Sequence, residues 1–154
     1  MEINYRPIVA TDIAALIDLR AQTRENAISQ QALAEVYGVT VDATAAELQR
    51  GLQGWLAETD GRAVGFAMGD KRSAEVTVVA VLDGYEHRGI AKTLLSLVCQ
   101  WLFGCGYAEL WLDASPNPQF RSFGFYRHLG WRRKGQPKND NDTLLLSREA
   151  FEAA

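Results

Sequence analysis

Hydrophobic and polar positions along the chain follow two periods, and the clearest change between them lies in residues 74–104. Residues 74–82 form a short β-branched apolar run, residues 83–89 are polar and contain two glycines, and from Ile90 the apolar positions recur at helical spacing. The helical stripe comprises Ile90, Leu94, Leu97, Val98, Trp101 and Leu102, followed by Gly104 and Gly106. The pattern predicts a strand, a tight loop and a helix that packs its stripe on a sheet and ends at these glycines.

The rest of the chain has the pattern of further short strands and helices. Strands are expected over residues 3–8, 54–59, 63–69, 108–114, 131–134 and 143–147, and helices over residues 13–21, 30–37 and 43–51 and from the loop 115–118 to residue 129 or 130. Thr11 and Asp12 are expected to cap the first helix. Asp60-Gly61, between two strands, is typical of a hairpin turn. Hairpins with one crossover helix imply an α/β (α+β) fold whose mixed central sheet of about seven strands is flanked by helices.

Length and composition fit one folded domain. The chain has 154 residues, 47% hydrophobic and 10% aromatic, so a single domain over residues 1–154 is expected. A net charge of −3 argues against nucleic acid as a partner. No apolar run reaches transmembrane length and the start MEINYR lacks a signal-peptide pattern, so no membrane partner and a cytoplasmic location are expected. The spacing of Cys99, Cys105, His87 and His128 matches no metal site, and Cys99 is expected to be a small buried residue of the long helix.

The loop before the long helix combines small residues with positive charge. The first turn of a helix has backbone N–H groups without partners and the positive end of the helix dipole, so such a loop can bind a phosphate. Gly89 allows a ligand to approach the backbone, Ala91 adds only a methyl group, and Arg88 and Lys92 are cations. Many glycine-containing turns bind nothing, so spacing alone leaves both interpretations open. A P-loop is excluded because Lys92 comes too late, and a dinucleotide loop because His87 replaces the third glycine.

Residues 79–95, VAVLDGYEHRGIAKTLL, resemble the acetyl-CoA-binding motif of the GNAT superfamily of N-acetyltransferases. The family motif reads Gln or Arg, two residues, Gly, one residue, then Gly or Ala at the start of a helix. Residues 88–91 match its core, while Glu86 stands where Gln or Arg is usual and Asp83 where Pro is common. The resemblance implies that backbone N–H groups of this loop bind the CoA phosphates. The implied cofactor-binding residues here are His87, Arg88, Gly89, Ile90, Ala91 and Lys92.

A second stretch, residues 120–131 (FRSFGFYRHLGW), extends the resemblance. GNAT enzymes commonly have Phe or Leu followed by Tyr, then three or four residues, then Gly and an aromatic residue. Here Phe125-Tyr126 and Gly130-Trp131 match. The resemblance implies that Tyr126 donates a proton to the departing thiolate of CoA. The alternative is an amphipathic tyrosine at the edge of the core with its hydroxyl bonded to backbone.

Two residues just before that tyrosine extend the expected cofactor site. Gln119 stands where the family frequently has an Asn that contacts the pantetheine arm of CoA, and Asn117 lies in the same loop. Arg121, at the start of its helix, is expected to reach a CoA phosphate. The alternative for Arg121 is a solvated arginine on the surface.

Acetyl transfer to an amine also needs a proton acceptor. An alkyl ammonium group has a reference pKa of about 10.4, so it must lose a proton before its nitrogen attacks a thioester. Glu75 lies eleven residues before Glu86, as the catalytic glutamate does in the histone-acetylating branch of the family, and is the first candidate base. Asp113 is the second candidate, and an exposed strand carboxylate is the alternative for Glu75. The oxyanion is expected to meet a backbone N–H of the central strand near Val79 to Val81.

Residues 20–37 are expected to line the acceptor side of the cleft, because the resemblance implies that the first helices cover it. Arg20 and Arg24 lie four residues apart, with Asn26 beside them, and are candidates to bind a carboxylate on the acceptor. The alternative is a solvated helix face on which these arginines pair with a neighbouring acid such as Asp18.

These observations predict an N-acetyltransferase. The expected reaction moves an acetyl group from acetyl-CoA, the co-substrate, to a primary amine of a small molecule, with or without a carboxylate, or of a peptide. The amine attacks directly in a ternary complex, and no metal is implied. A homodimer is the default expectation for the assembly. The competing hypothesis is a non-catalytic GNAT-like module that binds acyl-CoA as a sensor or binds a partner.

Overall fold

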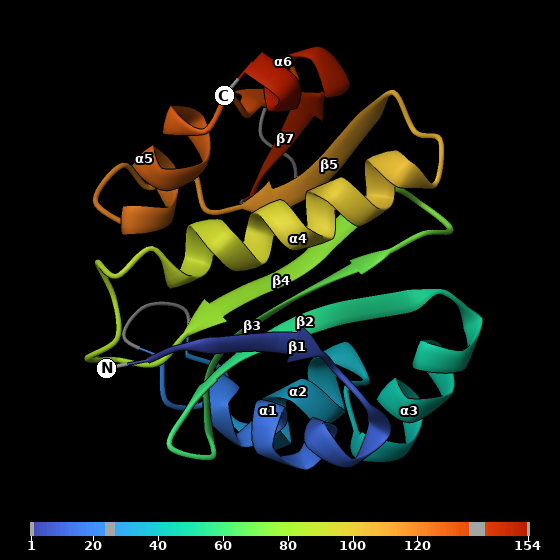
Figure 1. Cartoon of the computed structure of the whole chain (residues 1–154), viewed down its shortest axis with the longest axis vertical. Coiled ribbons are helices and arrows are strands. Elements are labelled where there is room, and N and C mark those ends of the chain that lie inside the picture. The colour runs from blue at the N-terminus through green and yellow to red at the C-terminus, as the bar shows by residue number, and fades with distance from the viewer. Residues whose placement is uncertain (1, 24–26, 136–140, 154) are drawn as a thin grey trace.

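The computed structural model describes residues 2–23, 27–135 and 141–153 and contains a seven-stranded mixed sheet (Figure 1). The strands are β1 (Asn4–Pro7), β2 (Leu52–Thr59), β3 (Arg62–Asp70), β4 (Glu75–Val81), β5 (Glu109–Ala114), β6 (Arg132–Arg133) and β7 (Asp142–Ser147). Their order across the sheet is β1-β2-β3-β4-β5-β7-β6. The β4–β5 pair is parallel and the other neighbours are antiparallel, so the predicted mixed sheet is confirmed.

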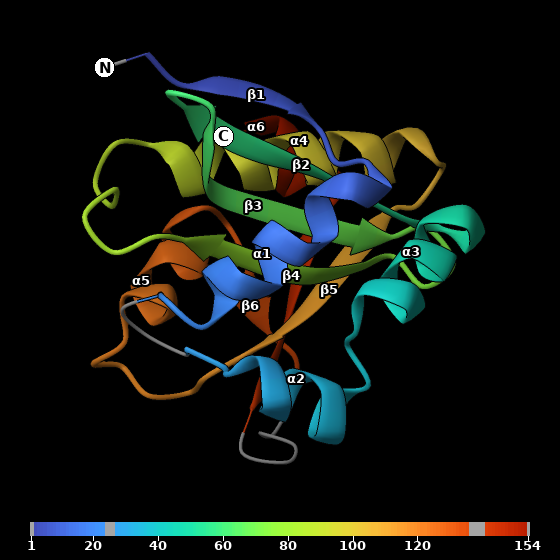
Figure 2. The ribbon, with the colours of Figure 1, turned by 90° about the horizontal axis from the view of Figure 1, so that it is seen from below.

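Helices cover both faces of this sheet (Figures 1 and 2). They are α1 (Ile13–Arg20), α2 (Gln30–Tyr37), α3 (Val41–Arg50), α4 (Ile90–Gly104), α5 (Arg121–His128) and α6 (Arg148–Ala153). In Figure 2 the strands β2 to β4 lie between α1 in front and α4 behind. α4 packs across β2, β3 and β4. Of the predicted stripe, Ile90, Leu94, Val98 and Leu102 are buried, whereas Leu97 and Trp101 are half-buried. The buried face is completed by Leu95, Cys99 and Phe103. None of the described helices is both long and apolar enough to cross a membrane.

Two glycines of β3 allow α4 to lie close to the sheet. A Cβ atom on Gly69 would lie 2.7 Å from Cγ1 of Val98 and 3.0 Å from Cδ1 of Leu102, and one on Gly65 would lie 3.2 Å from Cγ2 of Ile90. These three α4 residues are fully buried. The close approach therefore fixes the position of α4, and with it the position of the loop that precedes the helix.

Replacing Gly69 with Ala is expected to lower the free energy of unfolding by about 1–3 kcal/mol, because the new methyl group overpacks the contact with α4. Chemical denaturation followed by circular dichroism measures this change. Gly104→Ala at the end of α4 is the matched control, since its Cβ meets nothing within 4 Å and is expected to leave stability unchanged or slightly raised. Equal stability of Gly69→Ala and the wild type would contradict the close packing.

Three local details differ from the sequence predictions. The sequence does not predict α6, because a helix of six residues is too short to show a clear hydrophobic period. The helix is supported by packing of Phe151 on Phe103, whose ring centroids lie 5.3 Å apart. The first helix begins with a 3-10 turn over Ala10–Asp12, in which Asp12 accepts a hydrogen bond from the backbone N–H of Val9 at 2.8 Å instead of capping Ile13. The strand expected over 131–134 contains only Arg132–Arg133.

Candidate active site

The parallel strands β4 and β5 meet at one end of the sheet and then separate. Among the described residues they pair in register only at Glu75 and Trp111, next to a hydrogen bond of 3.2 Å from the Trp111 N–H to the Ala74 carbonyl. Further along β4 the register against β3 shifts, because Val76 and Val78 pair with consecutive residues of β3 and leave Thr77 as an extra residue. A bulge bends its strand. The later half of β4 is thus free of β5.

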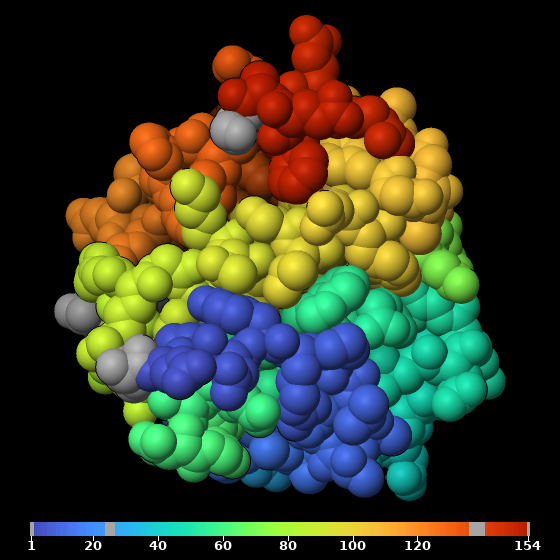
Figure 3. Space-filling view, in the orientation of Figure 1, coloured from blue at the N-terminus to red at the C-terminus, as the bar shows by residue number. Residues whose placement is uncertain are grey.

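A cavity of about 550 Å³ lies where the two strands have separated. Its walls come from β4, the 83–89 loop, the first turn of α4, the end of α1 and the inner face of α5. The lining residues are Arg20, Thr23, Val79, Ala80, Val81, Tyr85, Glu86, His87, Gly89, Ile90, Ala91, Lys92, Arg121, Ser122, Phe125 and Tyr126. Exposed residues of the 83–89 loop and the first turn of α4 reach the surface beside α5 (Figure 3). The structure therefore brings most of the expected cofactor residues and Tyr126 into one cavity.

The 83–89 loop needs glycine for its backbone shape. Gly89 has a φ of 77° and is the residue immediately before α4, and a Cβ atom there would meet nothing within 4 Å. The left-handed conformation, rather than lack of space, explains this glycine. His87 also has a positive φ, 65°, which is unfavourable for a residue with a side chain. Further along the chain, Gly89, Ile90 and Ala91 line the cavity.

Two of the expected cofactor residues lie away from the cavity wall. The Arg88 guanidinium stacks over the ring of Tyr85, 5.8 Å from its centroid, and Arg88 is not a lining residue. Gln119 donates its backbone N–H to Oδ1 of Asn117 at 3.0 Å, in the turn before α5, and is likewise outside the lining. Lys92 lies at the cavity and is exposed.

An ion pair joins α5 to the 83–89 loop. Nη2 of Arg121 lies 2.9 Å from Oε2 of Glu86, and Oε1 of Glu86 accepts a hydrogen bond of 2.9 Å from the Gly84 N–H. Nη1 of Arg121 lies 3.3 Å from Nε2 of His87. Burial opposes ionisation of Glu86, but the bonds from Arg121 and from backbone N–H groups outweigh it and lower the pKa of Glu86. The carboxylate is therefore charged at neutral pH.

Tyr126 lies in the core and lines the cavity. It is 8% exposed, and its ring makes edge-to-face contacts with Phe125 and Trp131, with centroids 5.1 and 6.0 Å away. In the part of the chain that the structure describes, no residue forms a hydrogen bond with the Tyr126 hydroxyl. Burial, with a smaller effect of Cys99, raises the pKa of Tyr126, and Arg20 opposes this shift weakly. The phenol thus stays neutral at neutral pH and has a proton to donate.

Two further residues lie near Tyr126, and of these only Ser122 lines the cavity. Ser122 lies one helical turn before Tyr126, and its Oγ is a buried atom without a hydrogen-bond partner among the described residues. A buried unpaired hydroxyl is unfavourable, so Ser122 is a polar group of the cavity wall that lacks a partner among the residues that the structure describes. Cys99 of α4 is buried, as predicted, and burial raises its pKa to about 12.

A second cavity, of about 740 Å³, lies under α1, α2 and α3 and shares Arg20 with the first. Arg20 is the last residue of α1, and burial lowers its pKa, while Tyr126 and Tyr37 oppose this shift. Of the other residues expected to bind the acceptor, Arg24 and Asn26 lie outside the described residues. Arg20 is thus the described residue that lines both cavities.

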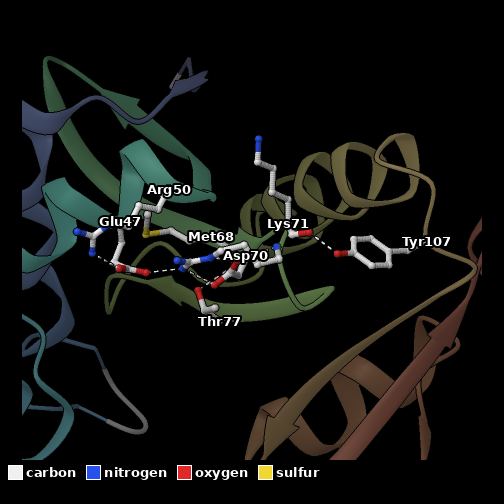
Figure 4. A network of polar contacts seen from close by, with 8 residues as sticks. Glu47, Arg50, Met68, Asp70, Lys71, Thr77 and Tyr107 are labelled. Atoms are coloured by element: carbon white, nitrogen blue, oxygen red, sulfur yellow. Dashed lines mark hydrogen bonds and ion pairs between the residues drawn. The ribbon is translucent and has the colours of Figure 1, made fainter.

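Three carboxylates line the second cavity, and two of them are paired. Glu47 and Asp70 both bind Arg72, which ties α3 to the end of β3 (Figure 4). In the same network the Tyr107 hydroxyl donates to the Lys71 carbonyl. Asp113, on β5, accepts a hydrogen bond of 2.7 Å from the Thr143 hydroxyl.

Glu75 lies at the start of β4, near the carboxylates of the second cavity. It is half-buried and not a lining residue of either cavity. Burial raises the pKa of Glu75, and the charges of Asp113 and Asp70 raise it further. At about 3.3 Å per residue, Glu75 is about 13 Å along the strand from Val79. Asp113 follows Trp111, the partner of Glu75, by two residues, so it lies further toward the separated ends of the strands.

The fold is shared with solved N-acetyltransferases. PaiA N-acetyltransferase from Thermoplasma acidophilum, solved in complex with coenzyme A, has a TM-score of 0.81 over 96% of this chain and 99% of that chain, at 19% identity. The yncA protein of Salmonella typhimurium, solved with its cofactor acetyl-CoA, has a TM-score of 0.69 over 94% of this chain and 93% of that chain, at 18% identity. At these identities the likeness defines the fold, which is the GNAT fold.

Residues 14–131 match the model of the Acetyltransferase (GNAT) family, and the chain belongs to that family. Human N-acetyltransferase 8B is 32% identical over 91 residues, which cover 53% of this chain and 39% of the relative. An uncharacterized N-acetyltransferase of Mycobacterium bovis is 34% identical over 82 residues, which cover 51% of this chain and 52% of the relative. The chain thus spans about half or less of the length of these curated relatives. The resemblance seen in the sequence is confirmed.

Proposed function

We propose that this chain transfers an acetyl group from acetyl-CoA to a primary amine by direct attack in a ternary complex. One observation carries the proposal: the helix-start loop of the family motif and Tyr126 line the same cavity, beside the half of β4 that has separated from β5. An anion-binding end and a proton donor in one cavity are what a CoA thioester requires. The CoA and acetyl-CoA in the solved structures of similar fold support the same co-substrate here.

The cavity residues fit the parts of acetyl-CoA in order. Backbone N–H groups at the start of α4 bind the pyrophosphate, and Lys92 and Arg121 add positive charge. The backbone of β4 over residues 79–81 pairs with the amides of the pantetheine arm on the edge that β5 has left. The Ser122 hydroxyl, unpaired within the described chain, then gains a partner from the same arm.

The chemical step needs two proton movements. The amine nitrogen attacks the thioester carbonyl carbon, and a backbone N–H near Val79 to Val81 stabilises the negative charge that develops on oxygen. As the C–S bond breaks, Tyr126 gives its phenolic proton to the departing sulfur. Glu75 and Asp113 together accept the ammonium proton through water, because burial and the nearby charge of Asp113 raise the proton affinity of Glu75. The acceptor amine, of a small molecule or peptide, enters through the second cavity, where Arg20 is placed to bind a carboxylate on it.

Release of free thiol from acetyl-CoA in the presence of a broad panel of primary amines tests this function. The expected result is thiol release that depends on both the protein and at least one amine. Tight binding of acetyl-CoA without turnover of any amine would favour the acyl-CoA sensor instead. Absence of CoA binding would reject both functions.

Replacing Asp113 with Asn is expected to move the acidic limb of the pH profile of kcat/KM to lower pH. A general base works when deprotonated, so the rate falls as pH drops through its pKa. Removing the negative charge of Asp113 lowers the pKa of Glu75, and the deprotonated form then persists at lower pH. At neutral pH the weaker base is expected to lower kcat/KM by about threefold to tenfold.

Measurement of kcat/KM as a function of pH, from acid to neutral pH, detects this shift. Glu109→Gln is the matched control, since Glu109 lies on the same strand and is not among the charges that raise the pKa of Glu75. An acidic limb that stays in place, or moves to higher pH, would contradict the role of the Glu75 and Asp113 pair.

A further inference from the structure

The carboxylate of Glu86 is an anion held inside the mouth of the first cavity. It is bound by the guanidinium of Arg121 at 2.9 Å and by the backbone N–H of Gly84 at 2.9 Å. Its side chain is only 15% exposed, and both Glu86 and Arg121 line the cavity. A guanidinium and a loop N–H are the donors that proteins use for phosphate. The chain therefore provides its own anion at the place where a phosphate of the cofactor is expected.

We propose that Glu86 is an internal competitor of the pyrophosphate of acetyl-CoA for Arg121. When the cofactor binds, Arg121 exchanges the Glu86 carboxylate for a phosphate oxygen. The Arg121–Glu86 ion pair is then lost, and its free energy is subtracted from the free energy of cofactor binding. This inference rests on the proposed function, because it needs CoA in the first cavity. It assigns Glu86 and Arg121 a regulating role in cofactor affinity and in release of the product CoA.

The charges and exposure of the two residues favour an exchange over a permanent structural pair. The Arg121 side chain is 36% exposed, and ion pairs at that exposure contribute little to stability. A pyrophosphate carries more negative charge than one carboxylate and attracts the guanidinium more strongly. Arg121 also lies 3.3 Å from His87, within the loop that is proposed to bind the pyrophosphate. It therefore meets a bound phosphate without any movement of α5.

The alternative role of Glu86 is to hold Arg121 in place for the phosphate. The two roles predict opposite signs. If Glu86 positions Arg121, its neutralisation weakens CoA binding because the guanidinium loses its orientation. If Glu86 competes, its neutralisation tightens CoA binding because the guanidinium is released and a like charge is removed from beside the phosphates.

Calorimetric titration of wild type, Glu86→Gln and Glu152→Gln with CoA, ADP and pantetheine distinguishes these roles. Glu86→Gln is expected to bind CoA and ADP about fivefold more tightly than the wild type does. Its affinity for pantetheine, which has no pyrophosphate, is expected to equal that of the wild type. Glu152, an exposed residue of α6 that lines neither cavity, controls for the change in net charge and is expected to leave all three affinities unchanged. In an Arg121→Gln background the gain from Glu86→Gln is expected to shrink, since no guanidinium is left to release.

Other results of the titrations would contradict either this proposal or the proposed function. Unchanged or weaker CoA binding by Glu86→Gln would overturn the proposal, as would an equal gain for pantetheine or a gain that persists undiminished without Arg121. If wild-type protein binds none of the three probes, the proposed function itself fails. Thermal denaturation of both glutamate variants without ligand checks that the fold is kept.

Discussion

Replacing Gly89 with Asp is expected to weaken acetyl-CoA binding by at least about 100-fold. The new carboxylate would stand at the start of α4, where the proposed pyrophosphate lies, and two negative charges within a few ångströms in a partly enclosed site repel strongly. The fold should survive the change. A Cβ at Gly89 meets nothing within 4 Å, and Asp is one of the residues that tolerate a positive φ such as the 77° found here.

Gly89→Asn is the matched control, because it adds a side chain of the same size without the charge. It is expected to weaken binding by about tenfold, since its side chain hinders close approach of a ligand to the backbone. Isothermal titration of the wild type and both variants with acetyl-CoA separates the effect of charge from that of side-chain size. The ratio of the affinities of the Asp and Asn variants reports on the charge alone. Equal affinities of Gly89→Asp and wild type would mean that no anion binds at this loop.

The elements that the sequence predicts well are those with a complete pattern of their own. The structure has β4 and α4 within one or two residues of the strand and helix predicted over residues 74–82 and 90–104. The prediction of α4 succeeds because its apolar residues lie on one side and glycines flank the helix. α6 lacks such a pattern. Its support comes from the ring contact of Phe151 with Phe103, which are far apart in sequence, so local periodicity could not reveal it.

The same division applies to the candidate site. The contiguous loop residues His87 to Lys92 were recognisable because their spacing is itself the motif. Glu86 was recognisable only as a departure from that motif. Its pairing with Arg121, 35 residues away, depends on how α5 packs beside the loop. Ser122 gave no signal at all in the sequence, since an unpaired buried hydroxyl is defined by its neighbours in space.

The candidate general base was the least predictable part of the site for a related physical reason. Glu75 and Asp113 were separate candidates for one base in the sequence. The parallel pairing of Glu75 with Trp111 brings Asp113, two residues further along β5, near Glu75, so that its charge adds to the effect of burial in raising the pKa of Glu75. Whether two acids act alone or together depends on strand register, which the sequence of either strand does not contain.

Replacing Tyr126 with Phe is expected to lower kcat by about 100-fold and to leave the KM for acetyl-CoA nearly unchanged. The hydroxyl is proposed to act only when the C–S bond breaks, so its loss affects the transition state more than the bound substrates. A positioned general acid contributes about 10²–10⁴-fold to such a step. Because burial raises the pKa of Tyr126, the phenol remains a proton donor throughout the physiological pH range.

The Phe variant isolates the hydroxyl from the ring. Tyr126 packs edge-to-face against Phe125 and Trp131, and a phenylalanine ring keeps both contacts, so the melting temperature is expected to change little. Steady-state kinetics of thiol release, with thermal denaturation alongside, measures both quantities. Since no described residue bonds to this hydroxyl, its removal leaves no buried group of the described chain without a partner. A Tyr126→Phe variant with wild-type kcat would therefore show that another group, or water, protonates the departing thiolate.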